Sequence, residues 1–227
     1  MDLRHTALRL IRRFALATGG AAFVACAAFP PLIRAAEPLP FVVAADAQAA
    51  RPIAVGASVP TLTLKTSDGA DFDLAAALAA KPSLLIFYRG GWCPFCNTQL
   101  AELQSYQDKF LALGYQIFAV SPDAPGSMPA TVEKNHLGYT LLSDVAMQAS
   151  SAFGIAWRVE AASAERFAAR GITLAPVPGE AGAFWLPVPA VFVVRPPGVV
   201  AHVFSDPNFR VRPPAAEIFA AAEAALK

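Results

Sequence analysis

The sequence has 227 residues and a formal net charge of +1 at pH 7, from 18 basic and 17 acidic side chains. No basic run follows the first fifteen residues, so the charge pattern gives no indication of a nucleic-acid partner. The length suffices for one domain of ordinary size and a short appendage.

An export signal or membrane anchor is predicted over residues 1–36. Basic side chains, ending with the pair Arg12-Arg13, precede the uncharged stretch 14–29, and two prolines follow it. A basic segment before an apolar one is typical of a bacterial export signal. The arginine pair is compatible with the twin-arginine route and with the general secretory route, and the sequence leaves both open.

Processing of this segment also has alternatives. Cys26 lies where a weak lipoprotein processing site would have its cysteine, although a small apolar residue within the signal is the simpler interpretation. An uncleaved anchor is the other alternative, because the stretch 14–33 is near the minimum length that spans a bilayer. We therefore expect an exported, periplasmic protein that contacts a membrane only through this segment, if it is retained or lipidated.

A flexible linker is predicted over residues 37–55, which are rich in alanine and proline and have no periodicity. The folded domain is then expected to span residues 56–227. Along this domain the apolar patterns predict alternating strands and helices. The predicted strands are 62–65, 71–73, 83–88, 116–120, 139–142, 191–194 and 199–204, and the predicted helices are 73–80, 97–113, 130–136, 146–153, 161–169 and 214–226. Residues 159–185 are otherwise irregular. The alternation is typical of a parallel α/β sheet, which the last two strands close as an antiparallel hairpin.

The motif that carries most chemistry is Cys93-Pro94-Phe95-Cys96, between the apolar strand 83–88 and the following helix. A thiol at the start of a helix is stabilised as thiolate by the helix dipole and by unpaired N–H groups. Such a site lowers a cysteine pKa from about 8.5 to about 7 or below, and the spacing allows a disulfide between the two sulfurs. The motif predicts redox catalysis by Cys93 and Cys96.

Other uses of the two cysteines have less support. Zinc usually needs four ligands, and Cys26, His5, His136 and His202 have no ligand spacing. A c-type haem would need histidine at position 97, where the chain has Asn97. A purely structural disulfide is the remaining alternative, but a Pro-Phe pair behind a tryptophan is more typical of a redox motif. We expect no metal and no cofactor.

Several segments of the domain share their pattern with a known family. The most specific is Phe-Tyr-Arg-Gly-Gly-Trp-Cys-Pro-Phe-Cys at 87–96, and the supporting segments are 61–64, 68–69, 72–74, 186–189 and 206–209. Together they resemble the thioredoxin fold and, within it, the peroxiredoxin-like group of the alkyl hydroperoxide reductase and thiol-specific antioxidant family. The resemblance implies an α/β, thioredoxin-like fold: a central mixed β-sheet flanked by helices, with an N-terminal hairpin extension.

The resemblance also implies roles for residues around the thiols. Pro189 matches the cis-proline that lies beside the thiols of thioredoxin-like proteins, with an ordinary proline at a strand edge as the alternative. Arg89 would lower the thiol pKa and polarise a peroxide, with a solvated charge at a strand end as the alternative. Trp92 would shield the sulfurs, with core packing as the alternative. Arg158 and Arg195 are candidates for the distal arginine of peroxiredoxins.

The sequence departs from the usual peroxiredoxin pattern P-x-x-x-[TS]-x-x-C. Aligned on Cys96, this pattern has Arg89 at its proline and Cys93 at its hydroxyl, and residues 97–100 resemble its continuation. In thioredoxins the attacking thiolate is the more N-terminal cysteine of the motif, which here is Cys93 at the start of the helix. Both assignments are open, and we favour Cys93 as nucleophile and Cys96 as resolving cysteine.

The expected function is a thiol-dependent peroxidase that reduces hydrogen peroxide or alkyl hydroperoxides through a dithiol–disulfide cycle. A thioredoxin-like or other dithiol reductant is the expected partner. The alternative is a thiol–disulfide oxidoreductase acting on exported proteins, which the missing Thr/Ser hydroxyl favours, and a redox-sensing module is a third class. The sequence selects no proton carrier among Asp68, Asp71 and Asp73.

Overall fold

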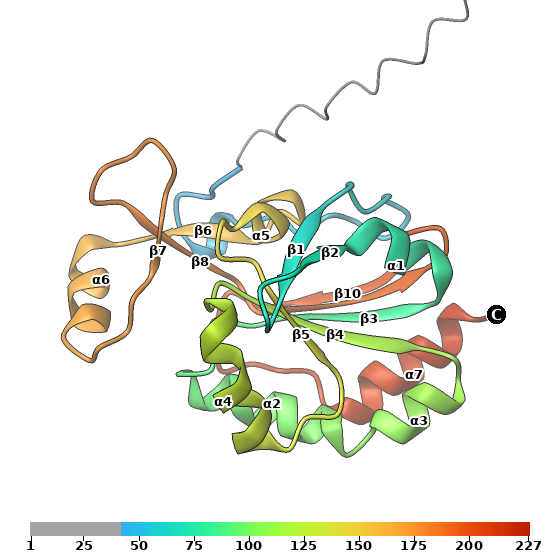
Figure 1. Cartoon of the computed structure of the whole chain (residues 1–227). Helices are drawn as coiled ribbons and strands as arrows, with labels where there is room; N and C mark the ends of the chain where they lie inside the picture. The colour runs from blue at the N-terminus through green and yellow to red at the C-terminus, as the bar shows by residue number, and fades with distance from the viewer. Residues whose placement is uncertain (1–41) are drawn as a thin grey trace, which may run out of the picture. The chain divides into compact units, whose positions relative to one another are not determined.

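A seven-stranded mixed sheet is the centre of residues 42–227, the part of the chain that this computed structural model describes (Figure 1). The strand order is β10-β9-β3-β4-β5-β1-β2. The strands are β1 (Thr63–Thr66), β2 (Asp71–Asp73), β3 (Ser83–Phe87), β4 (Gln116–Ser121), β5 (Thr140–Ser143), β9 (Ala190–Arg195) and β10 (Val199–Ser205). Strands β3, β4 and β5 run parallel, and every other pair is antiparallel. The predicted mixed sheet, with its N-terminal hairpin β1–β2, is confirmed.

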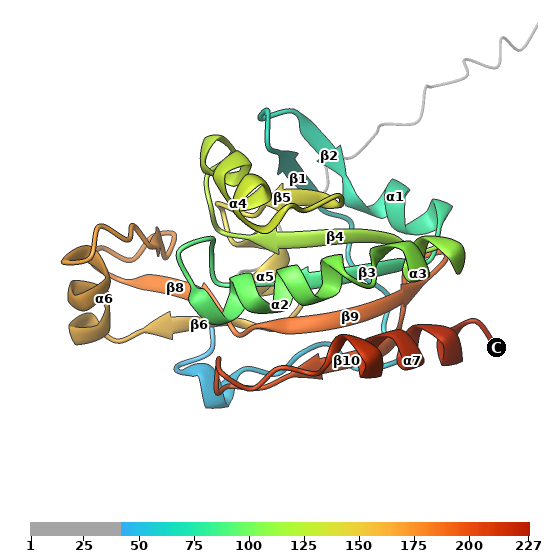
Figure 2. The ribbon, with the colours of Figure 1, turned by 90° about the horizontal axis from the view of Figure 1, so that it is seen from below.

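Helices cover both faces of this sheet, four on one face and two on the other (Figures 1 and 2). The first face carries α2 (Pro94–Gln104), α3 (Gln107–Ala112), α4 (Met128–Asn135) and α7 (Ala215–Ala225), and the second carries α1 (Leu74–Ala80) and α5 (Gln148–Ala152). Alternate residues of β3 enter the two cores, Leu84 and Ile86 on one side and Leu85 and Phe87 on the other. Burial on both faces explains why β3 is a continuous apolar run.

The helix predicted over 97–113 is two helices, and the first begins earlier, at Pro94. Proline suits the first position of a helix because its missing N–H would have no partner there. The break falls at Ser105 and Tyr106, where the N–H of Tyr106 bonds the carbonyl of Leu103. The earlier start makes Cys93 the N-cap residue of α2.

The stretch 159–185, expected to be irregular apart from one helix, belongs to a small antiparallel sheet of order β6-β8-β7. Its elements are β6 (Ala156–Val159), α6 (Ala161–Ala168), β7 (Ala175–Pro176) and β8 (Phe184–Pro187). The helix prediction is confirmed, and the missed strands have only two to four residues. This insertion lies between α5 and β9, at the end of the main sheet where α6 and β8 appear in Figure 1.

Residues 44–53 are attached to the domain, which corrects the flexible linker and the domain start at Gly56 expected from sequence. The N–H of Ala44 bonds the carbonyl of Ala156 and its carbonyl accepts from Arg158, at 2.9 and 2.8 Å. Further along, Ile53 donates to Phe153 at 3.0 Å, and Ala47–Ala49 forms a 3₁₀ turn. Alanine-rich sequence without periodicity can still pair its backbone with a strand edge, which composition does not reveal.

The predicted export segment 1–36, with the arginine pair and Cys26, lies outside the described residues. Among residues 42–227, no helix has both the length and the apolar character that crossing a membrane requires.

Candidate active site

Cys93 lies at the junction of β3 and α2, and Cys96 is one helical turn further on. Both thiols are free and almost completely buried, with exposed fractions of 1% and 0%. Phe95, between them, is 41% exposed and projects at the helix tip. The structure therefore brings together the two cysteines predicted to be catalytic, with the first of them at the helix N-terminus.

The two glycines before the motif are required by close contacts. Gly90 has φ 140°, and a Cβ there would overlap the indole of Trp92 and the carboxylate of Asp123. A Cβ on Gly91 would overlap the hydroxyl of Thr131. The N–H of Gly91 donates to Oδ2 of Asp123 at 2.8 Å, which fixes the loop that leads to Cys93.

Asp123 is an acidic residue in contact with the loop before the motif, and it was not predicted from sequence. Burial raises its pKa, against the hydrogen bonds from Gly91 and Ser121. The three acidic residues considered from sequence lie instead on the β1–β2 hairpin: Asp71 pairs with Lys65, and Asp73 caps α1. Asp123 lies just after the end of β4, and β4 is the neighbour of β3, the strand that leads to the motif. The position of Asp123 at the end of a predicted neighbouring strand was therefore the signal in the sequence.

Asn97 supports the loop from inside the helix. Its Nδ2 donates to the carbonyls of Gly91 and Cys93 at 2.8 and 3.1 Å. Its Oδ1 accepts from Nδ2 of Asn135 at 2.8 Å, so α4 holds the amide in place. The sequence reasoning used Asn97 only to exclude a haem site. The signal in the sequence was an amide side chain, Asn97, one helical turn after Cys93, from where it can bond the carbonyls of the loop.

The electrostatics differ between the two thiols. The pKa of Cys93 is lowered from 9.0 to about 6, chiefly by the hydrogen bond from the Cys96 thiol, against the opposing effect of burial. The Cys96 main-chain N–H and the charges of Arg89 and Arg212 lower it further. Interaction with Cys93 and burial raise the pKa of Cys96 well above its ordinary value. At pH 7 the thiolate is therefore on Cys93 and the proton on Cys96.

Arg89 is a buried cation beside the thiolate, with an exposed fraction of 7%. Its guanidinium carbon lies 4.2 Å from the ring centre of Phe209, 4.9 Å from Trp92 and 5.6 Å from Phe167. Burial lowers the pKa of Arg89, and the charge of Cys93 opposes this shift. Arg89 thus lies beside the thiols, where it was expected. Trp92 packs against the guanidinium of this arginine.

A second cation, Arg212, comes from the segment between β10 and α7. Its Nη2 lies 3.8 Å from the sulfur of Cys96. The arginines considered from sequence are elsewhere: Arg158 forms a salt bridge with Glu180 on the insertion, and Arg195 lies at the far end of β9. The strand register explains why Arg195 is far from the thiols. Phe87, at the motif end of β3, pairs with Ala190, and Arg195 is five residues further along β9.

A cavity of about 670 Å³ opens at Cys93. Its walls come from the motif, the insertion, the 186–189 segment and the 207–209 segment. The lining side chains include Arg89, Trp92, Cys93, Phe95, Trp157, Arg166, Phe167, Arg170, Pro189 and Phe209. Cys96 does not line it, so Cys93 is the cysteine next to a small molecule in this cavity.

Pro189 lines this cavity, as expected, but its peptide bond is not cis. In residues 42–227 the one cis peptide is Pro196–Pro197, in the turn between β9 and β10. The carbonyl of Pro189 accepts a hydrogen bond from Ser205 at 3.4 Å. The insertion reaches β9 through β8, which ends at Pro187, so the chain approaches Pro189 as an extended strand.

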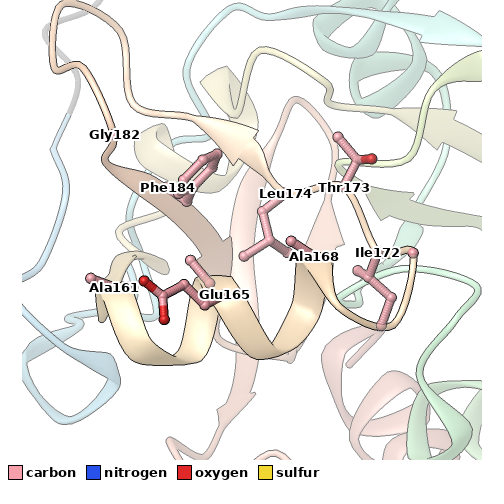
Figure 3. A pocket seen from close by; sticks show the side chains of 10 residues that line it. Ala161, Glu165, Ala168, Ile172, Thr173, Leu174, Gly182 and Phe184 are labelled. Carbon is pink, nitrogen blue, oxygen red and sulfur yellow. The ribbon is translucent and has the colours of Figure 1, made fainter.

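Two further cavities lie near the insertion. One of about 390 Å³ is lined by Arg89, Trp92 and Asp123, and it shares the first two residues with the cavity at Cys93. The other, of about 480 Å³, lies between α6 and the chain around Leu174 and Phe184 (Figure 3). Neither cavity includes a cysteine, so the thiol chemistry belongs to the 670 Å³ cavity.

Comparison with known families and proteins gives one consistent result. The model of the AhpC/TSA family matches residues 55–203. A putative peroxiredoxin Bcp of Haemophilus influenzae is 33% identical over 104 residues, which are 46% of this chain and 66% of that protein. A chloroplastic peroxiredoxin Q of Gentiana triflora is 34% identical over 92 residues, 40% of this chain and 42% of its own length. The alignments thus span less than two thirds of these relatives.

Solved structures show the same fold. A crystal structure of reduced Prx3 from Vibrio vulnificus in complex with hydrogen peroxide has a TM-score of 0.60 and 19% identity, and covers 75% of this chain and 99% of its own. At these identities the likeness establishes the thioredoxin-like peroxiredoxin fold.

Proposed function

Because the chain belongs to the AhpC/TSA family, we propose that it is a thiol-dependent peroxidase that reduces hydrogen peroxide or alkyl hydroperoxides. The observation that carries this proposal is the contrast between the two thiols. Cys93 lines the cavity beside Arg89 and has a pKa of about 6, whereas Cys96 is closed off and protonated. A nucleophile that faces the cavity and a protonated partner one turn behind it are what a dithiol peroxidase requires.

In the first step the Cys93 thiolate attacks the terminal oxygen of the hydroperoxide. The O–O bond breaks, the sulfur becomes a sulfenic acid, and the leaving alkoxide or hydroxide takes up a proton. The guanidinium of Arg89, buried beside the sulfur, supports the thiolate and the charge that develops on the leaving oxygen.

In the second step the Cys96 thiol attacks the sulfenic sulfur of Cys93. A disulfide forms, and water leaves with the Cys96 proton and the sulfenic oxygen. An external dithiol, of thioredoxin-like or other type, then reduces the disulfide and is itself oxidised. Phe95, exposed at the helix tip and packed on Phe209, lies where that reductant must approach.

The register that aligns Cys96 with the peroxidatic cysteine of the usual pattern makes the opposite assignment. Arg212 beside Cys96 is compatible with that register. Access and charge favour Cys93, because Cys93 lines the cavity whereas Cys96 does not, and because the pKa of Cys96 is raised. We therefore propose that Cys93 is the nucleophile and Cys96 the resolving cysteine.

The test is peroxide consumption by the full chain with a thioredoxin system as electron donor, beside Cys93→Ser and Cys96→Ser. We expect turnover in the wild type, no sulfenic acid in Cys93→Ser, and a sulfenic acid trapped on Cys93 in Cys96→Ser. A sulfenic acid on Cys96 in the Cys93→Ser protein would reverse the two roles. Peroxide consumption no faster than that of a free thiol, with reduction of insulin disulfides, would instead identify a protein disulfide reductase.

We propose further that the protein is exported to the periplasm. The basic start and the apolar stretch of residues 14–29 support this. A redox pair of cysteines is also compatible with an oxidising compartment such as the periplasm. Cell fractionation tests it: the protein is expected outside the cytoplasm, and Arg12→Lys with Arg13→Lys blocks export only if the route is twin-arginine. Recovery of the wild type in the cytoplasm would contradict export.

A further inference from the structure

The cavity at Cys93 is much larger than hydrogen peroxide needs. A molecule with two oxygen atoms fills roughly two water volumes, about 60 Å³, whereas the cavity has about 670 Å³. A volume of this size is typical of a site for an organic ligand, and much of the lining is apolar. The aromatic lining side chains are Trp92, Phe95, Trp157, Phe167 and Phe209.

One face of α6 and the turn after it contribute the polar part of this lining. Ser163 and Arg166 line the cavity from one side of α6, three residues apart, and Arg170 lines it from the turn that follows the helix. The opposite side, with Glu165 and Ala168, faces the separate cavity of Figure 3. Phe167 ties the helix to the active site through its ring contact with Trp92, with 5.2 Å between ring centres.

These two arginines are free of carboxylate partners among the described residues. Arg166 donates only to the hydroxyl of Ser163, at 2.7 Å, and neither arginine forms a salt bridge there. The two are four residues apart, Arg166 in the last turn of α6 and Arg170 just after it, and both line the same cavity, so both guanidinium groups can reach one anion.

Two acidic residues also line the cavity, and neither forms a salt bridge with the pair among the described residues. Asp46 uses Oδ1 to accept the N–H of Ala49 at 2.8 Å. Glu160 precedes α6 and forms no salt bridge with either arginine in the described part of the chain. Arg89 serves the thiolate, so Arg166 and Arg170 are the lining cations that remain for an anion in the cavity, and neither is held in a salt bridge among residues 42–227.

We propose that Arg166 and Arg170 form an anion-binding subsite of the active-site cavity, and that the preferred substrate is an organic hydroperoxide with a carboxylate group. This inference rests on the proposed peroxidase function and specifies its substrate. The apolar body lies against the aromatic lining, the hydroperoxide reaches Cys93, and the carboxylate binds the two arginines. The chemistry at sulfur is unchanged, because the subsite acts by orienting the substrate.

The experiment compares three substrates with the full chain: the hydroperoxide of an unsaturated fatty acid, the methyl ester of the same hydroperoxide, and hydrogen peroxide. The acid and the ester have the same reacting group and similar size, and differ in charge. We expect kcat/KM to be roughly tenfold higher for the acid than for the ester, and this ratio to fall with added salt. The double variant Arg166→Gln, Arg170→Gln should lose that preference, so that its acid-to-ester ratio falls towards one.

Two variants separate a local subsite from the overall charge of the protein. Glu165→Gln removes a charge from the other side of the same helix, and the acid-to-ester ratio should stay as in the wild type. Arg166→Lys with Arg170→Lys keeps both charges, and much of the preference should return. An unchanged ratio in the double glutamine variant, or no preference in the wild type, would overturn the subsite.

A binding measurement keeps this test independent of turnover. Decanoate should slow the alkylation of Cys93 by neutral iodoacetamide, methyl decanoate should protect less, and the double glutamine variant should lose the difference. Equal protection by both compounds would overturn the subsite even if peroxide is consumed. Protection by decanoate without any peroxide turnover would instead retain the anion site and reject the peroxidase.

Discussion

The guanidinium of Arg212 lies 3.8 Å from the sulfur of Cys96, although the two residues are 116 positions apart. Arg212 reaches the site from the segment that joins the last strand to the last helix. Together with Arg89 it places the thiol pair between two cations, and both arginines lower the pKa of Cys93. The C-terminal part of the domain thus supplies part of the electrostatics of a motif that lies at its centre.

Replacement of this cation should raise the pKa of the reactive thiol. For Arg212→Gln we expect the Cys93 pKa to rise by up to about one unit, which lowers the thiolate fraction at pH 7 from about nine tenths to about one half. Ultraviolet absorbance of the thiolate against pH measures it directly. Arg195→Gln, at the far end of β9, is the matched control. An unchanged titration would show that Arg212 is too distant from the charge to matter.

The reaction with peroxide should follow the ionisation of Cys93. Only the thiolate attacks, so the single-turnover rate should be half-maximal near pH 6 and constant well above it. Since the Cys96 thiol is the largest cause of the low pKa, Cys96→Ala should move the midpoint upward, whereas Cys96→Ser retains a donor and should move it less. Stopped-flow oxidation of each variant gives the midpoints. Equal midpoints for the alanine and serine variants would contradict this origin of the shift.

Asp123 should hold the loop rather than carry protons. Asp123→Ala leaves the N–H of Gly91 without its acceptor, at a cost of about 1–3 kcal/mol in the free energy of unfolding. Thermal unfolding should show a drop of about 2–4 °C for each kcal/mol. A similar Tm in the alanine variant would mean that water replaces the carboxylate.

The pH dependence gives a second measurement at this position. Because burial raises the folded-state pKa of Asp123, its contribution to stability is complete below the unfolded pKa of about 4 and is lost as pH rises through the folded value. Asp123→Asn has no group that titrates here, so its free energy of unfolding relative to that of the wild type should increase as the pH rises from about 4 through the folded-state pKa. Denaturant unfolding at several pH values measures the difference. A constant difference between the two proteins would show that the carboxyl has an unshifted pKa.

Gly91→Ala should disturb the same loop by steric overlap. The new Cβ meets the hydroxyl of Thr131 on α4, and we expect a loss of about 1–3 kcal/mol in stability together with slower oxidation of Cys93. Gly126→Ala is the control, since nothing lies within 4 Å of its Cβ position. The second change Thr131→Ala should restore part of the loss, and failure of this rescue would locate the strain elsewhere.

The sequence predicted the elements that local patterns define. The buried strand before Cys93, the helix after it and the capping of α1 by Asp73 each depend on neighbouring residues, and the structure has them. Residues brought in by the topology were not predictable in this way. Arg212 and Asp123 lie in segments without a distinctive motif, and only the pairing of strands β3, β4, β9 and β10 brings those segments to the thiols.

The insertion shows the same limit for a different reason. Its strands have two to four residues, too few for an alternating pattern to stand out from an irregular loop. The helix α6 was visible, but the direction of its faces was not, because that depends on the small sheet that carries it. The arginines that line the cavity could therefore not be assigned from sequence.

The attachment of residues 44–53 has a practical consequence for anyone who labels or immobilises this protein. Asp46, Ala47 and Gln48 are among the residues that line the cavity with Cys93, so the first described segment of the chain forms part of the cavity wall. A bulky tag joined just before residue 42 would compete with substrate and with the reductant for the same opening. The C-terminus, after α7, leaves the domain at the end away from α6 (Figure 1) and is the better place for a label or a surface linkage.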